Sequence, residues 1–528
     1  MLRIDQIRLL PGDSEALLPG KCARILRLPA EDIVSCAVLR RAIDAREGLT
    51  LVYTAAVEVK REDTVLRRCR DKRVSRYAPE TYALPAAVTA PEIPPIVVGA
   101  GPAGLFAALM LARCGARPIV LERGRPVEQR QADVERFWSG GALDTESNVQ
   151  FGEGGAGAFS DGKLNTGTRD VRHRFIMETL VRCGAPESIL TDAKPHVGTD
   201  MLHIALRSLR RELTEAGADI RFGARLESVR TKDGAVCGVT VRQDGAVYDL
   251  PARQVVLALG HSARDTFEML YRAGLAMEQK PFAMGVRIEH RQADVDAAQY
   301  RALAGHPALP PSTYKLSCHL PNGRSAFSFC VCPGGQVVAA ASETGRTVTN
   351  GMSEYARSGE NINGALLVNV TAEDFPSPHP LAGIALQRQV EAAAFALGGG
   401  DYRAPCQRVE DFLRGAPSAG AGRVTPSYRP GVVYTDMARC LPPFIAETLR
   451  LALPVLGKKL KGYDDPDALL TGVETRSSSP VRLVRDDNYE ANIRGIYPCG
   501  EGAGYAGGIL SAAADGMRCA EKLLEVCK

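Results

Sequence analysis

Apolar and polar residues follow two different spacings along this chain, and their succession predicts an α/β protein. Short apolar runs at 96–98 and 254–259 fit strands that are buried on both faces. Residues 201–216 instead place an apolar residue every three to four positions, which is the spacing of a helix with one apolar face. Strands and helices that alternate in this way are typical of a Rossmann-type domain.

The first 85 or so residues have the pattern of a small α+β unit. Alternation predicts a strand over 23–28, helical spacing predicts a helix over 30–46, and residues 49–59, rich in Val, Leu and Thr, predict a second strand. A Pro- and Ala-rich stretch at 84–95 then indicates an interdomain linker.

Later segments complete the expected domain plan. Asp-Gly pairs at 233–234 and 244–245 predict the hairpins of an antiparallel β-meander. Short strands and helices are mixed between about 280 and 475, which predicts an inserted α+β substrate domain. We therefore expect a small N-terminal α+β domain, the first part of a nucleotide-binding domain, the inserted domain and the C-terminal part of the nucleotide-binding domain, at 1–88, 89–280, 281–475 and 476–528.

Composition agrees with a globular protein of several domains. The chain has 528 residues, of which 24% are charged and 45% hydrophobic, and this argues against disorder. No run of 18 uncharged apolar residues exists, and the first residues lack the apolar core of an export signal. We therefore expect no membrane partner, a cytoplasmic location, and reduced thiols for the 14 cysteines.

The net charge of +4 is unevenly distributed. Residues 60–76 contain eight basic and three acidic residues, a charge of +5, so the rest of the chain sums to −1. A solvated linker or helix face is one interpretation of this segment, and a patch for an anionic partner is the other. The near balance overall does not call for nucleic acid as a partner of the whole chain.

A glycine-rich turn after the strand at 96–98 carries the dinucleotide fingerprint Gly-x-Gly-x-x-Gly. Its first glycine allows the tight turn, the second lets the backbone approach a pyrophosphate, and the third permits close packing of helix on strand. An acidic residue closes the next strand 23 positions later, where it can accept from ribose hydroxyls. The expected contacts are Gly99, Gly101, Pro102, Ala103, Gly104, Glu122 and Arg123.

A second glycine cluster, at 499–516, runs into an apolar helix, and here the chain resembles two-dinucleotide-fold flavoproteins of the glutathione reductase class. In that class a C-terminal Gly-Asp or Gly-Glu contacts the ribityl–pyrophosphate part of FAD, and the last helix points its N-terminus at the flavin. Gly260 follows a strand as in the Ala-Thr-Gly motif of that class, with Leu259 replacing the threonine. The resemblance implies FAD as cofactor, with further contacts at Gly260, Gly500, Glu501, Gly507, Gly508 and Ile509.

Longer motifs resemble a bacterial family of uncharacterised FAD-dependent dehydrogenases over nearly the whole chain, including Arg41–Arg46 of the N-terminal unit. The resemblance implies an FAD-dependent oxidoreductase and names no substrate. The motifs that carry it are residues 151–165, 194–200, 329–335, 474–480 and 498–505.

Two features of these motifs suggest chemistry. The loop at 152–162 holds five glycines, and it can either lie flat on an isoalloxazine, with Gly154 and Gly155 in contact, or form a flexible surface loop. Cys330 and Cys332 lie two positions apart on a predicted strand, which turns both thiols to one side. They could face a flavin as a redox pair, or both could be small buried apolar residues.

Other candidate groups lie beside glycine-rich or strand-end segments. Lys163, His196 and His261 could serve as acids or bases, although each alone is also a common structural residue. Arg476 could hold an anionic substrate, because a guanidinium matches a carboxylate. No His or Cys spacing fits a metal site, so no metal is expected.

The leading functional hypothesis is hydride transfer between a small organic substrate and flavin N5, with reoxidation by NAD(P), a quinone or another acceptor. The chain lacks a second Gly-x-Gly-x-x-Gly after a strand, so NAD(P)H would act only as a transient electron donor. One alternative is a flavin-binding redox sensor that switches through Cys330 and Cys332. Another is an FAD-dependent RNA-modifying enzyme that uses the basic segment 60–76. The sequence does not indicate an oligomeric state.

Overall fold

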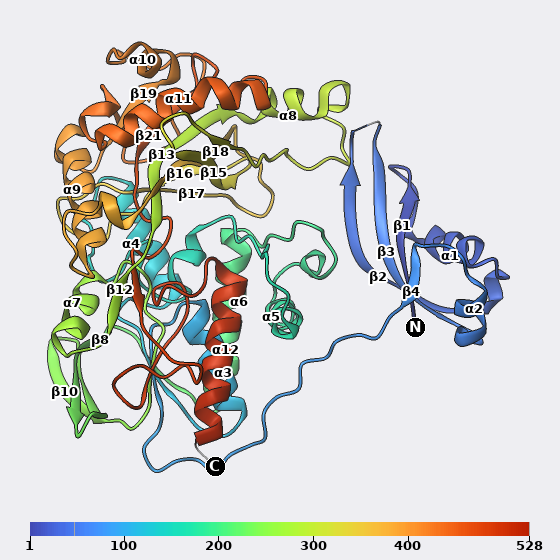
Figure 1. Cartoon of the computed structure of the whole chain (residues 1–528), viewed down its shortest axis with the longest axis horizontal. Helices are drawn as coiled ribbons and strands as arrows, with labels where there is room; N and C mark the ends of the chain where they lie inside the picture. The colour runs from blue at the N-terminus through green and yellow to red at the C-terminus, as the bar shows by residue number, and fades with distance from the viewer. Residues whose placement is uncertain (47, 527–528) are drawn as a thin grey trace.

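The computed structural model describes residues 1–46 and 48–526 and has a mixed α/β architecture (Figure 1). Its centre is a five-stranded parallel sheet with the order β23-β11-β5-β6-β7. β23 comes from the far end of the chain, so one sheet joins two separated stretches of sequence, and the expected Rossmann-type fold is confirmed. The strands are β5 (Ile96–Val98), β6 (Ile119–Leu121), β7 (Asp219–Arg221), β11 (Val255–Leu257) and β23 (Ile496–Pro498).

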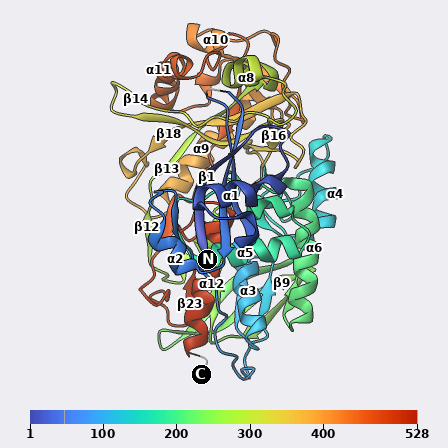
Figure 2. The same ribbon diagram turned by 90° about the vertical axis from the view of Figure 1, so that its right-hand side faces the viewer.

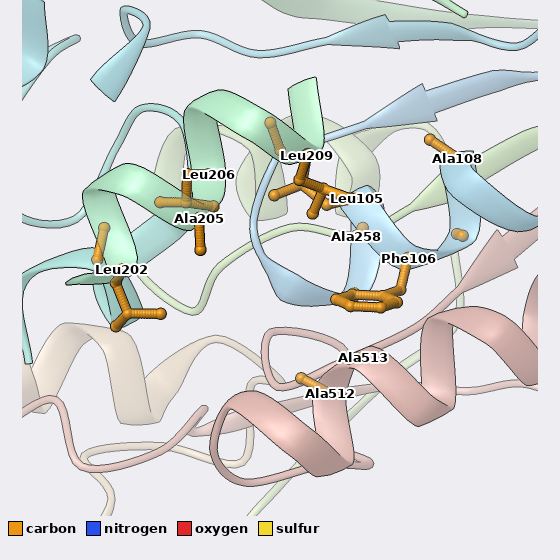
Figure 3. Packing of buried hydrophobic residues seen from close by; sticks show 14 of the residues in the cluster. Leu105, Phe106, Ala108, Leu202, Ala205, Leu206, Leu209, Ala258, Ala512 and Ala513 are labelled. Atoms are coloured by element: carbon orange, nitrogen blue, oxygen red, sulfur yellow. The ribbon is translucent and has the colours of Figure 1, made fainter. Parts of the chain in front are cut away.

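Helix α3 (Pro102–Arg113) packs between α6 (Thr199–Glu215) and α12 (Ile509–Val526) beside this sheet. α3 is buried along nearly its whole length and lies between α6 and α12 (Figure 3). The small residues of α3 and α12 allow this closeness: a Cβ on Gly516 would lie 2.0 Å from the Ala103 carbonyl oxygen. The apolar stripe of α6 faces α3, as the spacing predicts (Figure 3).

An antiparallel meander follows α6, built from β8 (Ala224–Lys232), β9 (Ala235–Gln243) and β10 (Ala246–Pro251). Asp233 and Asp244 have φ of 52° and 50°, and the glycine after each also has a positive φ. This left-handed pair of residues is what a type I′ hairpin turn requires, so both predicted turns are confirmed.

A larger second sheet has seven strands in the order β14-β15-β18-β13-β21-β19-β20. Helices α9 (Ala382–Leu397) and α11 (Pro443–Lys459) pack near it and help to enclose a second core. The strands are β13 (Phe282–Arg291), β14 (Ser317–His319), β15 (Ser325–Cys332), β18 (Asn361–Val370), β19 (Ala404–Arg408), β20 (Val432–Tyr434) and β21 (Leu469–Glu474).

Shorter elements connect these parts. They are α4 (Val127–Trp138), α5 (Val171–Arg182), α7 (Arg264–Arg272), β12 (Met277–Gln279), α8 (Gln292–Tyr300), β16 (Gln336–Ala339), β17 (Thr349–Met352), α10 (Val409–Arg414) and β22 (Val481–Leu483). Among the described residues, no helix is long and apolar enough to cross a membrane.

The N-terminal unit is a four-stranded antiparallel sheet with two helices and the connectivity β-α-β-β-α-β. Its strand order, β2-β3-β1-β4, is that of a ferredoxin-like fold. The basic residues of the segment 60–76 are exposed on α2, β4 and the turns beside them. The elements are β1 (Leu2–Leu9), α1 (Leu18–Leu26), β2 (Ile33–Asp44), β3 (Thr50–Val59), α2 (Glu62–Arg68) and β4 (Val74–Arg76).

Two predictions for this unit are wrong. The segment predicted as a strand, 23–28, belongs mostly to helix α1, whose buried residues begin at Leu18 and continue through Cys22 to Leu26. The segment 23–28 begins in the middle of this helix, so its few residues appeared to alternate although the longer stretch has helical spacing. The segment predicted as a helix, 30–46, is mainly strand β2. β-bulges in its pairing with β3 break the two-residue repeat, so apolar positions four apart resembled a helix face.

The N-terminal unit stands beside the rest of the molecule and is joined to it by an extended segment (Figures 1 and 2). The described residues between β4 and β5 contain no helix or strand. Arg41 on the edge strand β2 bonds to the main body: its N–H donates to the Thr191 carbonyl at 2.7 Å and its guanidinium pairs with Asp192 at 2.9 Å. The edge of β2 is thus partly covered by the main body.

Candidate functional site

A cavity of about 380 Å³ opens at the carboxyl ends of β5, β6 and β11 and reaches the second sheet. The chain leaves β5 towards β6 on one side and returns as β11 on the other, so this is a switch point of the sheet. Ligands of open α/β sheets bind at such points. The volume is within the range of pockets that take one small molecule or cofactor.

The fingerprint turn forms one end of the cavity. Gly101, Pro102 and Ala103 line it, and the first N–H groups of α3 lie at this end. Gly99 also lines it with φ of 102°, and a Cβ there would lie 2.5 Å from the Ala258 carbonyl oxygen. Gly104 does not line the cavity, and a Cβ on it would lie 1.8 Å from the Gly99 carbonyl oxygen. Its role is therefore close packing of helix on strand.

Glu122 is buried at the end of β6 and lines the same end of the cavity. Its carboxylate accepts three backbone N–H groups, from Ala100 at 2.7 Å and from Gly124 and Gly152 at 2.9 Å each. Each carboxylate oxygen has two lone-pair directions, so acceptor capacity remains for a ligand hydroxyl. The same residue thus ties the fingerprint turn to the glycine-rich loop at 152–162.

Arg123 lines the cavity next to Glu122. Its guanidinium pairs with Glu146 at 2.9 Å and with Asp265 at 2.8 Å, and it lies 4.1 Å from the centre of the Phe151 ring. These contacts hold the guanidinium in place, so that it closes the cavity beside Glu122.

The glycine loops divide into two kinds. A Cβ on Gly260, Gly507 or Gly508 would meet no atom within 4 Å, although all three residues line the cavity. These bare backbones therefore leave space that a ligand can fill. Gly500 and Gly154 do not line the cavity; their φ angles are 80° and 84°, and a Cβ would collide with Ala103 and Leu206 respectively.

The middle of the cavity holds a histidine–carboxylate pair. His261 Nδ1 lies 3.3 Å from Glu501 Oε1, and both residues line the cavity. Burial disfavours the ionised carboxyl, but the hydrogen bond and charge of His261 outweigh it and hold the pKa of Glu501 below its usual value. His261 is nine-tenths buried, and its Nε2 atom has no hydrogen-bond partner among the described residues. A polar ligand group would satisfy this atom. The first residue of α12, Ile509, completes the wall.

Lys163 and Asp161 line the far end of the cavity, and the Lys163 Nζ lies 2.6 Å from Asp161 Oδ2. Burial opposes the charge of Lys163, but Cys332, Cys330 and Asp161 outweigh it and raise its pKa. His196 pairs with Lys163 through the backbone, yet it does not line the cavity; its ring stacks on Tyr355 at 5.3 Å. Of these two predicted residues, the structure brings only Lys163 to the cavity.

The two cysteines do not share one face of β15. A β-bulge interrupts the pairing with β18 after Phe329, and Cys330 has φ of 40°. Cys330 is half-buried and lines the cavity, whereas Cys332 is fully buried and does not. The expectation that both thiols face the same ligand site is therefore wrong: only Cys330 lines the cavity, because the extra residue of the bulge breaks the two-residue alternation. The Cys332 thiol donates to the Cys330 carbonyl oxygen at 3.4 Å.

Two charged residues that the sequence analysis missed lie next to Cys330. Glu474 lines the cavity, and Arg287 lies behind it; their side chains pair at 3.1 Å, and Arg287 also donates to the Cys330 carbonyl oxygen at 2.9 Å. Burial raises the pKa of Glu474 to about 7, with Arg287 opposing the shift. A lone arginine in the apolar run 282–288 was the signal that could have found this site.

Arg476 also lines the cavity, but it is buried and its guanidinium is occupied. It pairs with Glu391 at 2.9 Å and donates to the hydroxyls of Ser262 and Ser342 at 3.1 and 2.5 Å. Glu391 also binds Arg264 at 2.7 Å, which joins α7 to α9. This network favours a structural role for Arg476 over the predicted contact with an anionic substrate.

In the described part of the chain, no group of His, Cys, Asp or Glu is placed to hold a metal ion.

Comparison with known proteins assigns three regions of the chain. An FAD binding domain matches residues 95–158, an FAD-dependent protein C-terminal domain-like family matches 281–477, and a domain of unknown function, DUF8436, matches 1–60. An uncharacterized protein of Clostridium beijerinckii is 45% identical over an alignment of 529 positions, which covers 99% of this chain and 98% of that protein.

Two further likenesses are partial. Protein FixC of Escherichia coli K12 is 30% identical over 203 residues, which are 37% of this chain and 42% of FixC. A structure of the flavin-dependent brominase Bmp2 covers 82% of this chain and 78% of its own at 12% identity, with a TM-score of 0.37. A likeness at that score supports no argument about function.

Proposed function

We propose that this chain, which belongs to the same family as the Clostridium protein and matches FAD-binding and FAD-dependent domain families, is an oxidoreductase that transfers a hydride between a small organic molecule and FAD. One observation carries the proposal. The cavity is continuous from the phosphate-binding turn at Gly99–Gly104 to a cluster of ionisable groups on the second sheet. A dinucleotide can therefore be held at one end while a substrate meets charged side chains at the other.

The residues on the Rossmann side fit the adenosine and pyrophosphate parts of FAD. α3 offers its N-terminus to phosphates, and Glu122 offers carboxylate oxygens to ribose hydroxyls. The bare backbones of Gly260, Gly507 and Gly508 and the unpartnered Nε2 of His261 fit the central part. When bound, FAD would supply a ring that accepts or gives two electrons as a hydride.

The residues at the far end are suited to moving a proton. Glu474 has a pKa of about 7 because it is buried, so it can hold or release a proton near neutrality. Lys163 keeps its charge beside Asp161 and can stabilise negative charge on a substrate oxygen. Phe329, which is 45% exposed next to Cys330, provides an apolar surface at this end. These groups describe a site for a small molecule with an oxygen or nitrogen function beside the carbon that loses or gains hydride.

The test has two stages. The protein is purified without denaturation and its flavin is extracted and identified. It is then titrated anaerobically with NADH, with NADPH and with panels of organic electron donors, while the absorbance of oxidised flavin is followed. The proposal predicts bound FAD that loses this absorbance with at least one donor. Purified protein without flavin that also takes up none on reconstitution would refute it.

Glu474→Gln separates proton transfer from cofactor binding. The variant keeps the shape of the side chain but cannot exchange its proton. We expect FAD content to stay the same, and reduction by an active donor to slow by about two orders of magnitude. Glu178→Gln, an exposed ion-pair variant on α5, is the matched control. An unchanged reduction rate in Glu474→Gln would remove Glu474 from the proposed chemistry.

A further inference from the structure

The cysteines beside the cavity form a thiol site that hydride transfer does not use. The bulge in β15 places Cys330 and Val331 together opposite one residue of β18, Gly364. In a regular strand, Cα atoms two residues apart are about 6.6 Å apart, near the upper limit of about 6.8 Å for a disulfide. The bulge breaks this regular spacing, and the Cys332 Sγ lies 3.4 Å from the carbonyl oxygen of Cys330. Cys330 is open to the cavity, and Cys332 lies behind it in the protein.

Positive charge surrounds the pair. Lys163 and Arg287 approach from two different segments, and the Arg287 guanidinium lies 3.8 Å from the Cys332 Sγ. The Cys332 side chain, together with these cations, lowers the pKa of Cys330 below its usual value, against burial and Asp161. The side-chain interaction with Cys330 and burial raise the pKa of Cys332 well above its usual value. These opposite shifts favour a thiolate at Cys330, which lines the cavity, and a protonated thiol at Cys332 behind it.

We propose that Cys330 and Cys332 reduce small hydroperoxides, with Cys330 as the attacking thiol and Cys332 as the resolving thiol. This activity goes beyond hydride transfer and needs no bound flavin for one turnover. Three requirements of the chemistry meet here: a thiolate, cations beside the oxygen that leaves, and a second thiol within reach. Glu474 and Lys163 supply acidic protons at the same place.

The reaction takes place in two steps. The Cys330 thiolate attacks the terminal oxygen of the hydroperoxide, the O–O bond breaks, and the alkoxide leaves as an alcohol with a proton from Lys163 Nζ. Cys330 is then a sulfenic acid. The Cys332 thiol gives up its proton and attacks the Cys330 sulfur, an S–S bond forms, and hydroxide leaves with that proton as water. Two electrons pass from the thiols to the peroxide, and an external dithiol restores the pair.

The position of Cys330 favours a hydroperoxide over a bulky disulfide. Cys330 is half-buried and lines the cavity wall. Cys237, on β9, is exposed and lies outside the cavity. Any partner must enter the cavity to reach Cys330. A small hydroperoxide needs less room there than a disulfide-linked peptide. Cys237 can therefore serve as a control thiol in the same chain, because it lies outside the cavity.

The test uses the full-length protein as purified, fully reduced with dithiothreitol and freed of it. One equivalent of hydrogen peroxide or cumene hydroperoxide is added at neutral pH, remaining thiols are alkylated, and the peptides are identified by mass spectrometry. We expect a disulfide between Cys330 and Cys332 that dithiothreitol reverses, with Cys237 unchanged. Cys332→Ser should stop at the sulfenic acid, which dimedone traps at Cys330. At pH 6, Cys330 should alkylate about tenfold faster than Cys237.

Three outcomes would overturn the proposal. One is oxidation that falls on Cys237 or other cysteines while Cys330 stays reduced. Another is a wild-type pair that glutathione disulfide oxidises and hydroperoxides do not, which would assign a different substrate class. The last is no dimedone adduct at Cys330 in Cys332→Ser, provided that the circular dichroism spectrum of the variant matches wild type. Each readout is independent of flavin turnover, so a failed hydride-transfer hypothesis leaves this test intact.

Discussion

Glu122 offers the sharpest test of how the cofactor end of the cavity is built. Its carboxylate accepts three buried backbone N–H groups, two at Oε1 and one at Oε2. Glu122→Gln keeps one oxygen for the Gly124 and Gly152 N–H groups but turns an NH₂ group towards the Ala100 N–H. Glu122→Ala leaves all three donors without an acceptor. The two variants therefore differ in how many buried N–H groups lose their acceptor: one in Glu122→Gln and three in Glu122→Ala.

The magnitudes follow from the number of donors that lose an acceptor. A buried donor without a partner costs about 1–3 kcal/mol. Glu122→Gln affects one N–H group and should destabilise the domain by about 1–2 kcal/mol, whereas Glu122→Ala affects three and should cost about 3 kcal/mol or more. Both variants also lose the acceptor for ribose hydroxyls, so FAD retention should fall, and more in the alanine variant.

The assay measures the thermal unfolding midpoint and the flavin-to-protein ratio for both variants. Glu178→Gln, on the exposed face of α5, serves as a control and should match wild type in both measurements. The expected order of stability is wild type, then Glu122→Gln, then Glu122→Ala. Equal midpoints and equal flavin content for all three proteins would refute the interpretation of Glu122.

Four further variants test other parts of the structure. Gly260→Ala should fold normally but retain less FAD, because its Cβ enters open cavity space; Gly99→Ala should instead lower the unfolding midpoint, because its Cβ meets a carbonyl oxygen at 2.5 Å. Normal flavin content in Gly260→Ala would argue against FAD at this wall. Glu391→Gln removes the charge that pairs two buried arginines and should destabilise the protein by about 3–5 kcal/mol in denaturant titrations, an effect that a merely exposed ion pair would not produce. Burial raises the pKa of Glu474 to about 7 from 4.5, so the folded state holds this proton where the unfolded chain has lost it. The corresponding stability, about 3 kcal/mol, is present below pH 4.5 and is lost as the pH rises through 7. Unfolding free energies measured across this range should fall less steeply in Glu474→Gln, and parallel curves would contradict the raised pKa.

Local features of the chain were predictable because their causes lie within a few neighbouring residues. The fingerprint at Gly99–Gly104 needs only a strand, a turn and a helix in order, and the Asp-Gly turns of the meander need only their own backbone preferences. The second glycine cluster was placed by its resemblance to flavoproteins, and it does reach the same cavity through Glu501, Gly507 and Gly508.

The N-terminal unit shows where a local pattern misleads. α1 and β2 are short amphipathic segments, and a window that begins late or crosses a bulge yields the wrong period. The pairing of β2 with β3 decides that β2 is a strand. That pairing is a tertiary contact that the apolar pattern of residues 30–46 does not contain.

The sequence by itself determined the Rossmann framework and the glycine-rich turns that line one end of the cavity, because these depend on backbone conformation near each motif, and its resemblance to flavoproteins indicated FAD. Only the tertiary structure decided which side chains lie at the far end of the cavity, where the ionisable groups gather. In the structure, His196 lies outside the cavity and Arg476 forms an ion pair with Glu391. Glu474 lies next to Cys330 in the cavity wall. The physical reason is that burial, ion pairing and the pKa of a side chain depend on neighbours from distant segments. A bulge of one residue was enough to leave Cys330 at the cavity wall and Cys332 buried behind it.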